Sequence, residues 1–347
     1  MKSFKLILFI LVIFLKTGNV LSENKLFNVN NIEIITKSFE NNENLAYRAM
    51  KKGYEELINR ILLEKDVKKL SELDFNEIQN LVSYYQILDD QIKKEKNKKY
   101  FNIYFDKEKF HNLLYLKGIS YSDIENFDIY LLPLLKKNDK VFVYSNNYFY
   151  QNWKKKNESE LIEFILPIEN IETIQQINLF QNKLFDIDPK DIFEDYENKN
   201  LTLIIIEIIN EKEIKVFLKT SIMGKRINRS LRINDKDLTD EKLYDYIILK
   251  VKNEIINIVK SQNLIDIRVP SFINIKFIQD KNNSLLELKK RINNIGLIEE
   301  IYVQELNNEF VSIKIKYLGK IDKIIEKLKN EKVILKYNGE VWSLKII

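Results

Sequence analysis

The stretch Leu201–Ile209, with the sequence LTLIIIEII, decides the fold class of this chain. Side chains alternate between the two faces of a strand, so this run presents apolar groups on both faces. Strands that are apolar on both faces are typical of the centre of a sheet that helices cover on each side. We therefore predict a buried central strand here, in an α/β (α+β) protein.

The segments on either side of this strand complete a central α/β module, which we place at residues 139–265. Further strands are expected at 141–143, 161–166, 214–217 and 226–233, and helices at 146–155, 171–179, 189–196 and 239–258. The last of these helices is long and carries apolar residues at helical spacing, which indicates one buried face.

An N-terminal α+β module is expected at residues 23–138. It opens with a strand at 27–35, followed by a helix for which Asn44 is a plausible N-cap, and Asp74 begins a capping-box pattern. A hairpin of 82–92 and 100–105 has a lysine-rich tip at 93–99. A further helix ends at Gly118. The apolar run Tyr130–Pro133 is expected to close the module, because proline usually interrupts a strand.

A C-terminal module is expected at residues 266–347. Its elements follow the order β-α-β-β-α-β, and a last hairpin on Asn338-Gly339 doubles the final strand. This order is that of the ferredoxin-like split βαβ motif. The chain is thus expected to consist of three small modules, the last of them ferredoxin-like βαββαβ with an extra hairpin strand.

Residues 1–22 have the features of a cleavable secretory signal peptide. Lys2 and Lys5 precede the apolar run Leu6–Leu15, and Val20 and Ser22 stand three and one residues before Glu23. The apolar run is about half the roughly 20 residues that a membrane-spanning helix needs. We expect an exported protein that is cleaved after Ser22 and lies in the periplasm.

The amino-acid composition restricts which chemistry the protein can perform and which kinds of partner it can bind. The net charge is +5, and three of the positive charges (Lys2, Lys5 and Lys16) belong to the leader, so the rest of the chain carries only +2. Nucleic-acid-binding domains are usually much more basic. No cysteine is present, which removes disulfides and thiolate chemistry. We expect no nucleic-acid partner and at most peripheral contact with a membrane.

Short motifs spread over most of the chain carry a resemblance to a known family. They are Ala46–Met50 (AYRAM), Leu57–Ile61 (LINRI), Tyr100–Asp106 (YFNIYFD), Leu113–Gly118 (LLYLKG), Leu131–Pro133 (LLP), Ile165–Ile171 (ILPIENI) and Ile315–Gly319 (IKYLG). With them the chain resembles an uncharacterised family of proteobacterial envelope proteins, catalogued as domain of unknown function 2066. The resemblance implies a periplasmic location and a modular fold, and it supplies no catalytic residues.

Two groups of residues are candidates for interaction with a partner. Trp153, Tyr148 and Tyr150 belong to an aromatic cluster, which fits either a core or an interface. Arg226, Arg229 and Arg232 lie in one expected strand. Their spacing by three places successive side chains on alternating faces, which fits a charged edge strand better than one anion-binding patch.

No catalytic, cofactor-binding or metal-binding set is expected. His111 is the only histidine and lacks an evident partner, so packing is the favoured role. Asp186, Asp188 and Asp191 lack the glycine and the closing glutamate of a calcium loop, and Asp188-Pro189 fits a helix N-cap.

The function expected from these observations is that of a non-enzymatic periplasmic binding or accessory protein with a protein partner in the cell envelope. The alternative is a binder of a small or polymeric envelope ligand, such as a lipid or a peptidoglycan fragment. A hydrolase with two catalytic carboxylates comes third, because acid pairs alone can cleave glycosides.

Overall fold

The computed structural model describes residues 25–36, 41–88, 97–124, 127–156, 162–193, 196, 199–210, 213–233, 240–278, 284–307 and 310–347. The signal peptide expected at 1–22 and most of the lysine-rich hairpin tip lie outside the described residues. No helix within the described ranges is long and apolar enough to cross a membrane.

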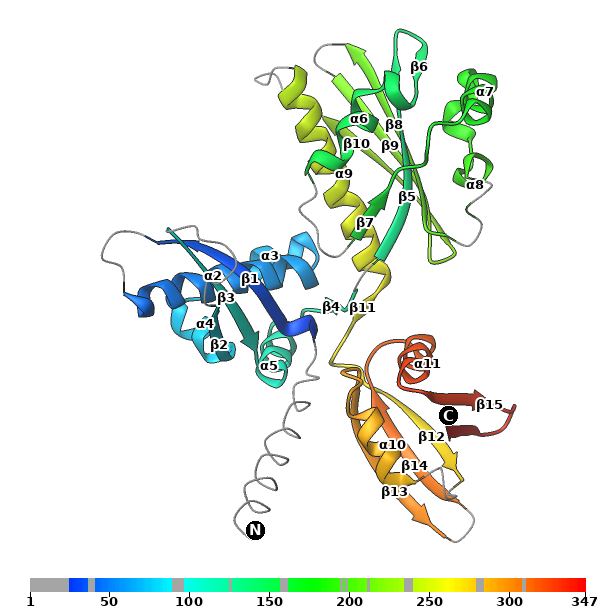
Figure 1. The fold of residues 1–347 in the computed structure, drawn as a ribbon. Coiled ribbons are helices and arrows are strands. Elements are labelled where there is room, and N and C mark those ends of the chain that lie inside the picture. Colours follow the sequence, from blue (N-terminus) through cyan, green and yellow to red (C-terminus); the bar gives the residue numbers. More distant parts are fainter. Residues whose placement is uncertain are drawn as a thin grey trace, which may run out of the picture. The chain divides into compact units, whose positions relative to one another are not determined.

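The protein is a mixed α/β protein that divides into two compact units. Unit 1 comprises Met1–Asp123 and Asn263–Ile347, and unit 2 comprises Ile124–Gln262. Unit 2 is therefore an insertion within unit 1. The chain leaves unit 1 after β4 (Tyr121–Ser122) and returns at β11 (Leu264–Ile265), and these two short strands pair antiparallel (Figure 1).

The sheet of unit 2 has β8 (Leu201–Asn210) at its centre, as the sequence predicts. Strand β8 pairs in parallel with β5 (Phe127–Lys137) and antiparallel with β9 (Glu213–Ile222). The edge strand β10 (Lys225–Ile233) lies beyond β9. Strands β6 (Lys140–Phe142) and β7 (Ile162–Ile165) pair with different parts of β5.

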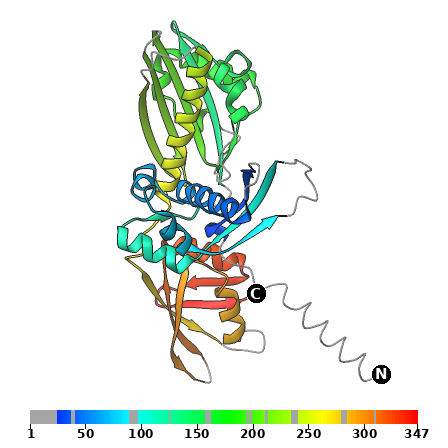
Figure 2. The same ribbon diagram turned by 90° about the vertical axis from the view of Figure 1, so that its left-hand side faces the viewer.

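Helices cover both faces of this sheet. On one face α9 (Asp240–Gln262) lies along the sheet (Figure 2), and α6 (Tyr148–Asn152) lies on the same face. They enclose an apolar core that includes Ile204 and Ile206 of β8. The other face has a separate core with Leu203, which α7 (Ile171–Leu179) and α8 (Pro189–Ile192) cover. The buried run of β8 thus supplies side chains to both cores.

The division of the chain differs from the expected boundary at residue 138, because β5 belongs to the sheet of unit 2 and does not close the N-terminal module. Pro133 lies in an interval of this strand where neither β7, paired at 127–130, nor β6, paired at 135–137, is alongside. The buried side chain of Asn147 donates to the Pro133 carbonyl at 2.8 Å. Proline is tolerated here because the strand has no neighbour at that point of its edge.

The N-terminal part of unit 1 is a three-stranded antiparallel sheet in the order β1-β3-β2 with helices beside it. Its elements are β1 (Asn28–Ile35), α2 (Asn42–Ile61), α3 (Glu64–Leu70), α4 (Phe75–Leu81), β2 (Val82–Leu88), β3 (Lys98–Phe105) and α5 (Lys107–Lys117). The capping box at Asp74 is confirmed. The N-cap of α2 is Asn41, not Asn44, because the Asn41 side chain accepts a hydrogen bond from the Asn44 amide at 2.9 Å.

The C-terminal part of unit 1 has the element order that the sequence predicts. Its elements are β12 (Ser271–Phe277), α10 (Leu285–Ile292), β13 (Ile298–Leu306), β14 (Val311–Tyr317), α11 (Ile321–Asn330), β15 (Val333–Tyr337) and β16 (Trp342–Ile346). The sheet order is β13-β14-β12-β16-β15. The extra strand β16 is inserted between β12 and β15, parallel to β12, instead of extending the edge of the sheet. This position buries Leu344 and Ile346 in the core.

Candidate binding pocket

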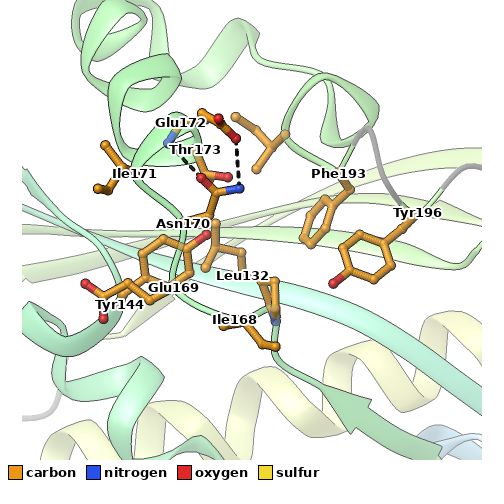
Figure 3. Close-up of a pocket in the computed structure, with 12 residues that line it drawn as sticks. Leu132, Tyr144, Ile168, Glu169, Asn170, Ile171, Glu172, Thr173, Phe193 and Tyr196 are labelled. Atoms are coloured by element: carbon orange, nitrogen blue, oxygen red, sulfur yellow. Dashed lines mark hydrogen bonds between the residues drawn. The ribbon is translucent and has the colours of Figure 1, made fainter.

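A pocket of about 480 Å³ lies in unit 2, on the face of the sheet that α7 and α8 cover (Figure 3). It is formed where the loop after β7 leads into α7. Its walls come from separate parts of the chain: Leu132, Tyr144, Pro167, Ile168, Glu169, Asn170, Ile171, Glu172, Thr173, Ile192, Phe193 and Tyr196. The volume lies in the range of about 300–1,000 Å³ that is usual for ligand-binding sites.

Hydrogen bonds hold the loop between β7 and α7 in place. The Tyr150 hydroxyl donates to the carbonyl of Pro167 at 2.7 Å. Asn170 is the N-cap of α7, and its side-chain oxygen accepts from the Glu172 amide at 2.7 Å. Its side-chain nitrogen donates to the Glu172 carboxylate at 3.3 Å. These bonds fix the backbone on which the exposed side chains of the pocket stand.

Aromatic rings form the inner walls of the pocket. The rings of Tyr144 and Tyr150 meet edge to face with centroids 5.2 Å apart, and those of Phe193 and Tyr196 with centroids 6.2 Å apart. Tyr130 of β5 lies behind Tyr196 at 4.5 Å. Such pairs are favourable ring arrangements, and they restrict the freedom of the side chains.

Tyr144 has the most constrained backbone of these residues. Its φ is 51°, in the left-handed region that a bulky residue rarely adopts. Burial raises the pKa of its hydroxyl, and hydrogen bonds with the Thr173 side chain and the Asn170 backbone oppose that increase. The hydroxyl is therefore neutral near pH 7 and belongs to the fixed polar framework of the pocket.

The rim of the pocket combines exposed apolar and acidic side chains. Ile168 and Ile171 are 85% and 72% exposed, and Glu169 and Glu172 stand beside them (Figure 3). Among the residues that the structure describes, no lysine or arginine lines the pocket. Residues 162–193, which carry this rim, contain six carboxylates and two lysines, in a chain whose net charge is +5. The site therefore suits a ligand with apolar groups and positive charge.

Catalysis by a carboxylate pair would need one carboxyl group with a raised pKa, usually through burial. Glu169 and Glu172 are both exposed. Ser145 donates to Glu169 at 3.3 Å, which orients a carboxylate and does not activate a serine nucleophile. The geometry of this pocket supports binding.

The aromatic candidates take different places in the structure. Trp153 is fully buried between the sheet and α9, so it is a core residue and its ring is not accessible to a partner. The Tyr148 hydroxyl donates to Asp245 of α9 at 3.1 Å. Tyr150 supports the pocket from behind. The structure therefore brings only Tyr150 to the candidate site.

The three arginines lie on β10, at the edge of the sheet. Arg226 pairs with Asp188 at 2.8 Å, near α8, and Arg229 pairs with Glu254 of α9 at 3.7 Å, on the opposite face of the sheet. Arg232 has no ion pair with a residue that the structure describes. The arginines thus form no single patch, because their spacing alternates between the two faces.

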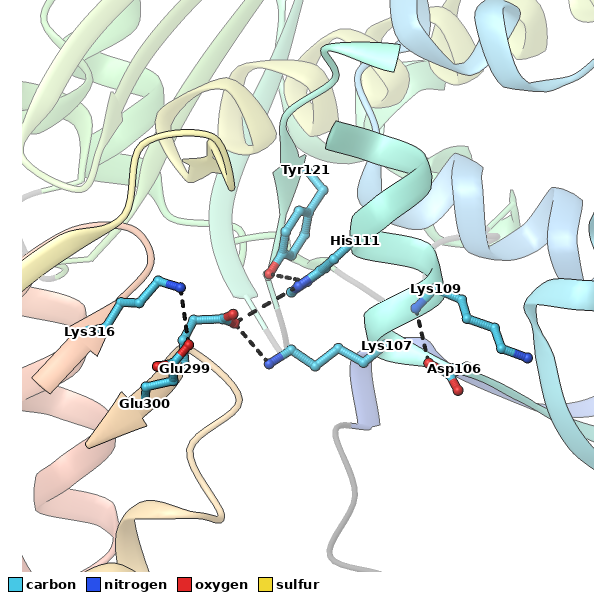
Figure 4. A network of polar contacts seen from close by, with 8 residues as sticks. All are labelled: Asp106, Lys107, Lys109, His111, Tyr121, Glu299, Glu300 and Lys316. Atoms are coloured by element: carbon cyan, nitrogen blue, oxygen red, sulfur yellow. Dashed lines mark hydrogen bonds and ion pairs between the residues drawn. The ribbon is translucent and has the colours of Figure 1, made fainter. Parts of the chain in front are cut away.

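Asp188 acts as the predicted N-cap of α8, where it forms a capping box with Asp191. Within the described residues, no three histidine, aspartate or glutamate side chains are grouped so that they could hold a metal ion. His111 packs in unit 1 against Phe27, with ring centroids 5.6 Å apart. It also packs against Tyr121 (Figure 4), with ring centroids 5.3 Å apart. A ring nitrogen and the Tyr121 hydroxyl are 3.2 Å apart.

Comparisons with known proteins add no family. No protein-family model matches the chain, and no curated protein sequence is similar to it. One solved structure, titled "Crystal structure of uncharacterized protein", aligns with 41% of this chain and 92% of its own at 5% identity. Its TM-score of 0.19 is too low to carry an argument about fold or function.

Reasoning from sequence did not find the pocket. Its walls come from β5, the segment after β6, the loop before α7 and the region of α8, which only the folded sheet brings together. One signal was present: the segment Ile165–Ile171 contains a proline and a carboxylate among isoleucines, between an expected strand and an expected helix. Large apolar side chains that gather on an exposed surface are one mark of a binding site.

Proposed function

We propose that this chain is a non-enzymatic, exported accessory protein of the bacterial cell envelope that binds a partner protein through the pocket of unit 2. The observation that carries the proposal is the rim, where Ile168 and Ile171 are exposed beside Glu169 and Glu172. Large exposed apolar side chains around a concave site are typical of binding surfaces.

The chemistry of the rim selects the kind of segment that would bind. An apolar side chain of the partner would enter between Leu132 and Phe193, and a lysine or arginine beside it would meet the two glutamates. Among the described residues that line the pocket, an anionic headgroup would meet two carboxylates and no cation. The acidic rim therefore favours a basic, apolar peptide segment over an anionic lipid.

Binding can be measured by fluorescence anisotropy with a labelled 12-residue peptide of alternating leucine and lysine. We expect binding that weakens when glutamate replaces the lysines of the peptide. Ile168→Asp is expected to reduce the affinity about tenfold, through lost apolar contact and a misplaced charge. The double variant Glu169→Gln/Glu172→Gln is expected to reduce the preference for the lysine peptide.

Leu286→Asp is the matched control, because Leu286 of α10 is 82% exposed and belongs to unit 1. This variant is expected to bind the peptide as the original chain does. Equal losses in Ile168→Asp and Leu286→Asp, or equal binding of the lysine and glutamate peptides, would contradict the proposed site.

A small envelope ligand is the second candidate function, and the pocket volume of about 480 Å³ favours it. Aromatic walls with a few fixed polar groups are usual for such ligands. A soluble peptidoglycan fragment that displaces the labelled peptide would support this function. Displacement should then be lost in Ile168→Asp and retained in Leu286→Asp.

The proposal that the protein is exported depends on residues 1–22, which have the features of a signal peptide. We expect the protein purified from its native envelope to begin at Glu23, because the apolar run is short and Val20 and Ser22 suit signal peptidase. N-terminal sequencing measures this directly. A membrane-bound protein that begins at Met1 would contradict both the cleavage and the periplasmic location.

A further inference from the structure

The C-terminal sheet of unit 1 has one face that α10 and α11 do not cover. Strand β12 shows the alternation: Ile273, Ile275 and Phe277 are buried in the core, whereas Phe272, Asn274 and Lys276 are exposed. We call this exposed side of the sheet the open face. By strand register it comprises Phe272, Asn274, Lys276, Glu300, Tyr302, Glu305, Ser312, Lys314, Lys316, Ile334, Lys336, Ser343 and Lys345.

Positive charge dominates the open face, with five lysines and two glutamates in that set. Glu300 is already engaged, because Lys316 pairs with it at 3.4 Å. Lys276, Lys336 and Lys345 are exposed and have no ion pair with a described residue. These cations stand on three strands, so the charge is spread across the sheet instead of following one groove.

Aromatic rings are interleaved with the lysines. Phe272 and Tyr302 are 50% and 43% exposed. The ammonium of Lys314 lies 4.5 Å from the centre of the Phe272 ring, and that of Lys276 lies 5.0 Å from the Phe310 ring. Aromatic rings beside cations are the combination found where proteins meet the headgroup region of a membrane.

We propose that the open face is a docking surface for an anionic phospholipid bilayer. Lysines distributed over several strands of one sheet face match a layer of phosphate charge, and the exposed rings would enter the boundary between headgroups and acyl chains. This inference is independent of the pocket in unit 2.

The observations favour a bilayer over a single-stranded nucleic acid. Nucleic-acid strands are usually bound in a groove whose aromatic rings offer free faces for stacking bases. On the open face, Lys314 is positioned over the Phe272 ring, and β14 separates that ring from Tyr302 on β13. The positive groups also lie side by side across the strands and do not form a single track.

The test is flotation of the chain from Glu23 to Ile347 with phospholipid vesicles. We expect binding to vesicles with 30 mol% phosphatidylglycerol in phosphatidylcholine, and none to phosphatidylcholine alone. The triple variant Lys276→Gln/Lys336→Gln/Lys345→Gln is expected to reduce the partition coefficient on the order of 100-fold, because each basic residue near an anionic surface contributes about fivefold.

A matched control removes the same charge from the helical side of the same sheet. Lys289, Lys290 and Lys329 are exposed on α10 and α11, and their replacement by glutamine is expected to change partitioning less than about threefold. Circular dichroism shows that both variants remain folded. Phe272→Ala is expected to weaken binding several-fold even at high salt, where only apolar contacts persist.

Three outcomes would overturn the proposal. The first is absence of binding to anionic vesicles. The second is equal loss in the open-face variant and in the control, which would show that net charge alone acts. The third is tight binding of a 20-residue oligothymidylate or of inorganic polyphosphate without vesicle binding, which would assign the face to a soluble polyanion.

Discussion

Replacing Trp153 with alanine is expected to lower the free energy of unfolding of unit 2 by about 3–5 kcal/mol. The Trp153 ring is fully buried in the core beneath α9 and meets Phe164 edge to face with centroids 6.2 Å apart. Its removal would leave a large cavity. It would also remove the ring that lies 5.7 Å from the ammonium of the buried Lys252.

Lys252 adds to the cost of this substitution. Its ammonium donates to the Trp153 carbonyl at 2.8 Å and lies over the rings of Trp153 and Phe164. A buried cation is tolerated when hydrogen bonds and ring faces replace water. The alanine variant keeps the carbonyl and loses one of the two rings, so the cation loses part of its stabilisation.

Trp153→Phe is the conservative comparison. The Trp153 indole nitrogen is buried and has no hydrogen-bond partner within the described part of the chain, so phenylalanine removes an unsatisfied donor while it keeps an aromatic ring. We expect this variant to cost less than about 1.5 kcal/mol. Hydrogen exchange with mass spectrometry should show lost protection in β8 and α9 for the alanine variant only. A loss below about 1 kcal/mol for alanine would contradict the buried position.

The elements that sequence predicts best are those whose signal is local. The run Leu201–Ile209 is apolar on both faces, as expected of a strand at the centre of a covered sheet, and its side chains enter the cores on both faces. The N-caps at Asp74 and Asp188 depend only on residues within one turn of helix, and both are present. These features needed no knowledge of the tertiary structure.

The sequence-based predictions that differ from the structure depend on contacts between segments that are far apart in the sequence. Pro133 suggests the end of a module, but β6 and β7 pair with other parts of β5 and leave that point of its edge without a neighbour, which makes a proline acceptable there. The hairpin on Asn338-Gly339 could be predicted from its turn residues. Its sequence does not indicate which of its two strands pairs with β12. Burial of Leu344 and Ile346 decides that, and it depends on the neighbouring helices.

The candidate site was less predictable than the fold for the same reason. Aromatic clustering in sequence drew attention to Trp153, which the core of unit 2 encloses completely. Tyr144, nine residues earlier, has a left-handed backbone and lines the pocket. Residues adjacent in sequence thus separate into the two cores on opposite faces of one sheet.

The second large effect is a loss of stability in acid that depends on His111. Burial, assisted by the positive charge of Lys107, lowers the pKa of His111 from 6.5 to about 4, and Glu299 partly opposes the shift. Between these values the unfolded chain binds a proton that the folded chain does not. The neutral histidine therefore makes its full contribution to the free energy of unfolding above pH 6.5, and this contribution is lost as the pH falls toward 4.

The size of this loss of stability follows from the difference between the two pKa values of His111, 6.5 in the unfolded chain and about 4 in the folded chain. Between pH 7 and pH 5, protonation of the unfolded state is expected to cost the folded protein about 2 kcal/mol. His111→Gln removes this term, since the chain has no other histidine. The variant should be less stable at pH 7, where it lacks the ring contacts with Phe27 and Tyr121, and the difference should decrease at pH 5.

Two measurements check this expectation. Urea unfolding of both proteins at pH 7 and pH 5 gives the change in their difference, in which the carboxylates common to both proteins cancel. The single imidazole also gives one set of ring signals in an NMR titration, so its midpoint can be read without assignment by mutation. A midpoint near 6.5, or a difference in stability that is constant with pH, would show that the His111 ring reaches water. In that case the charges of Lys107 and Glu299, which pair at 3.2 Å, would not shift the pKa of His111.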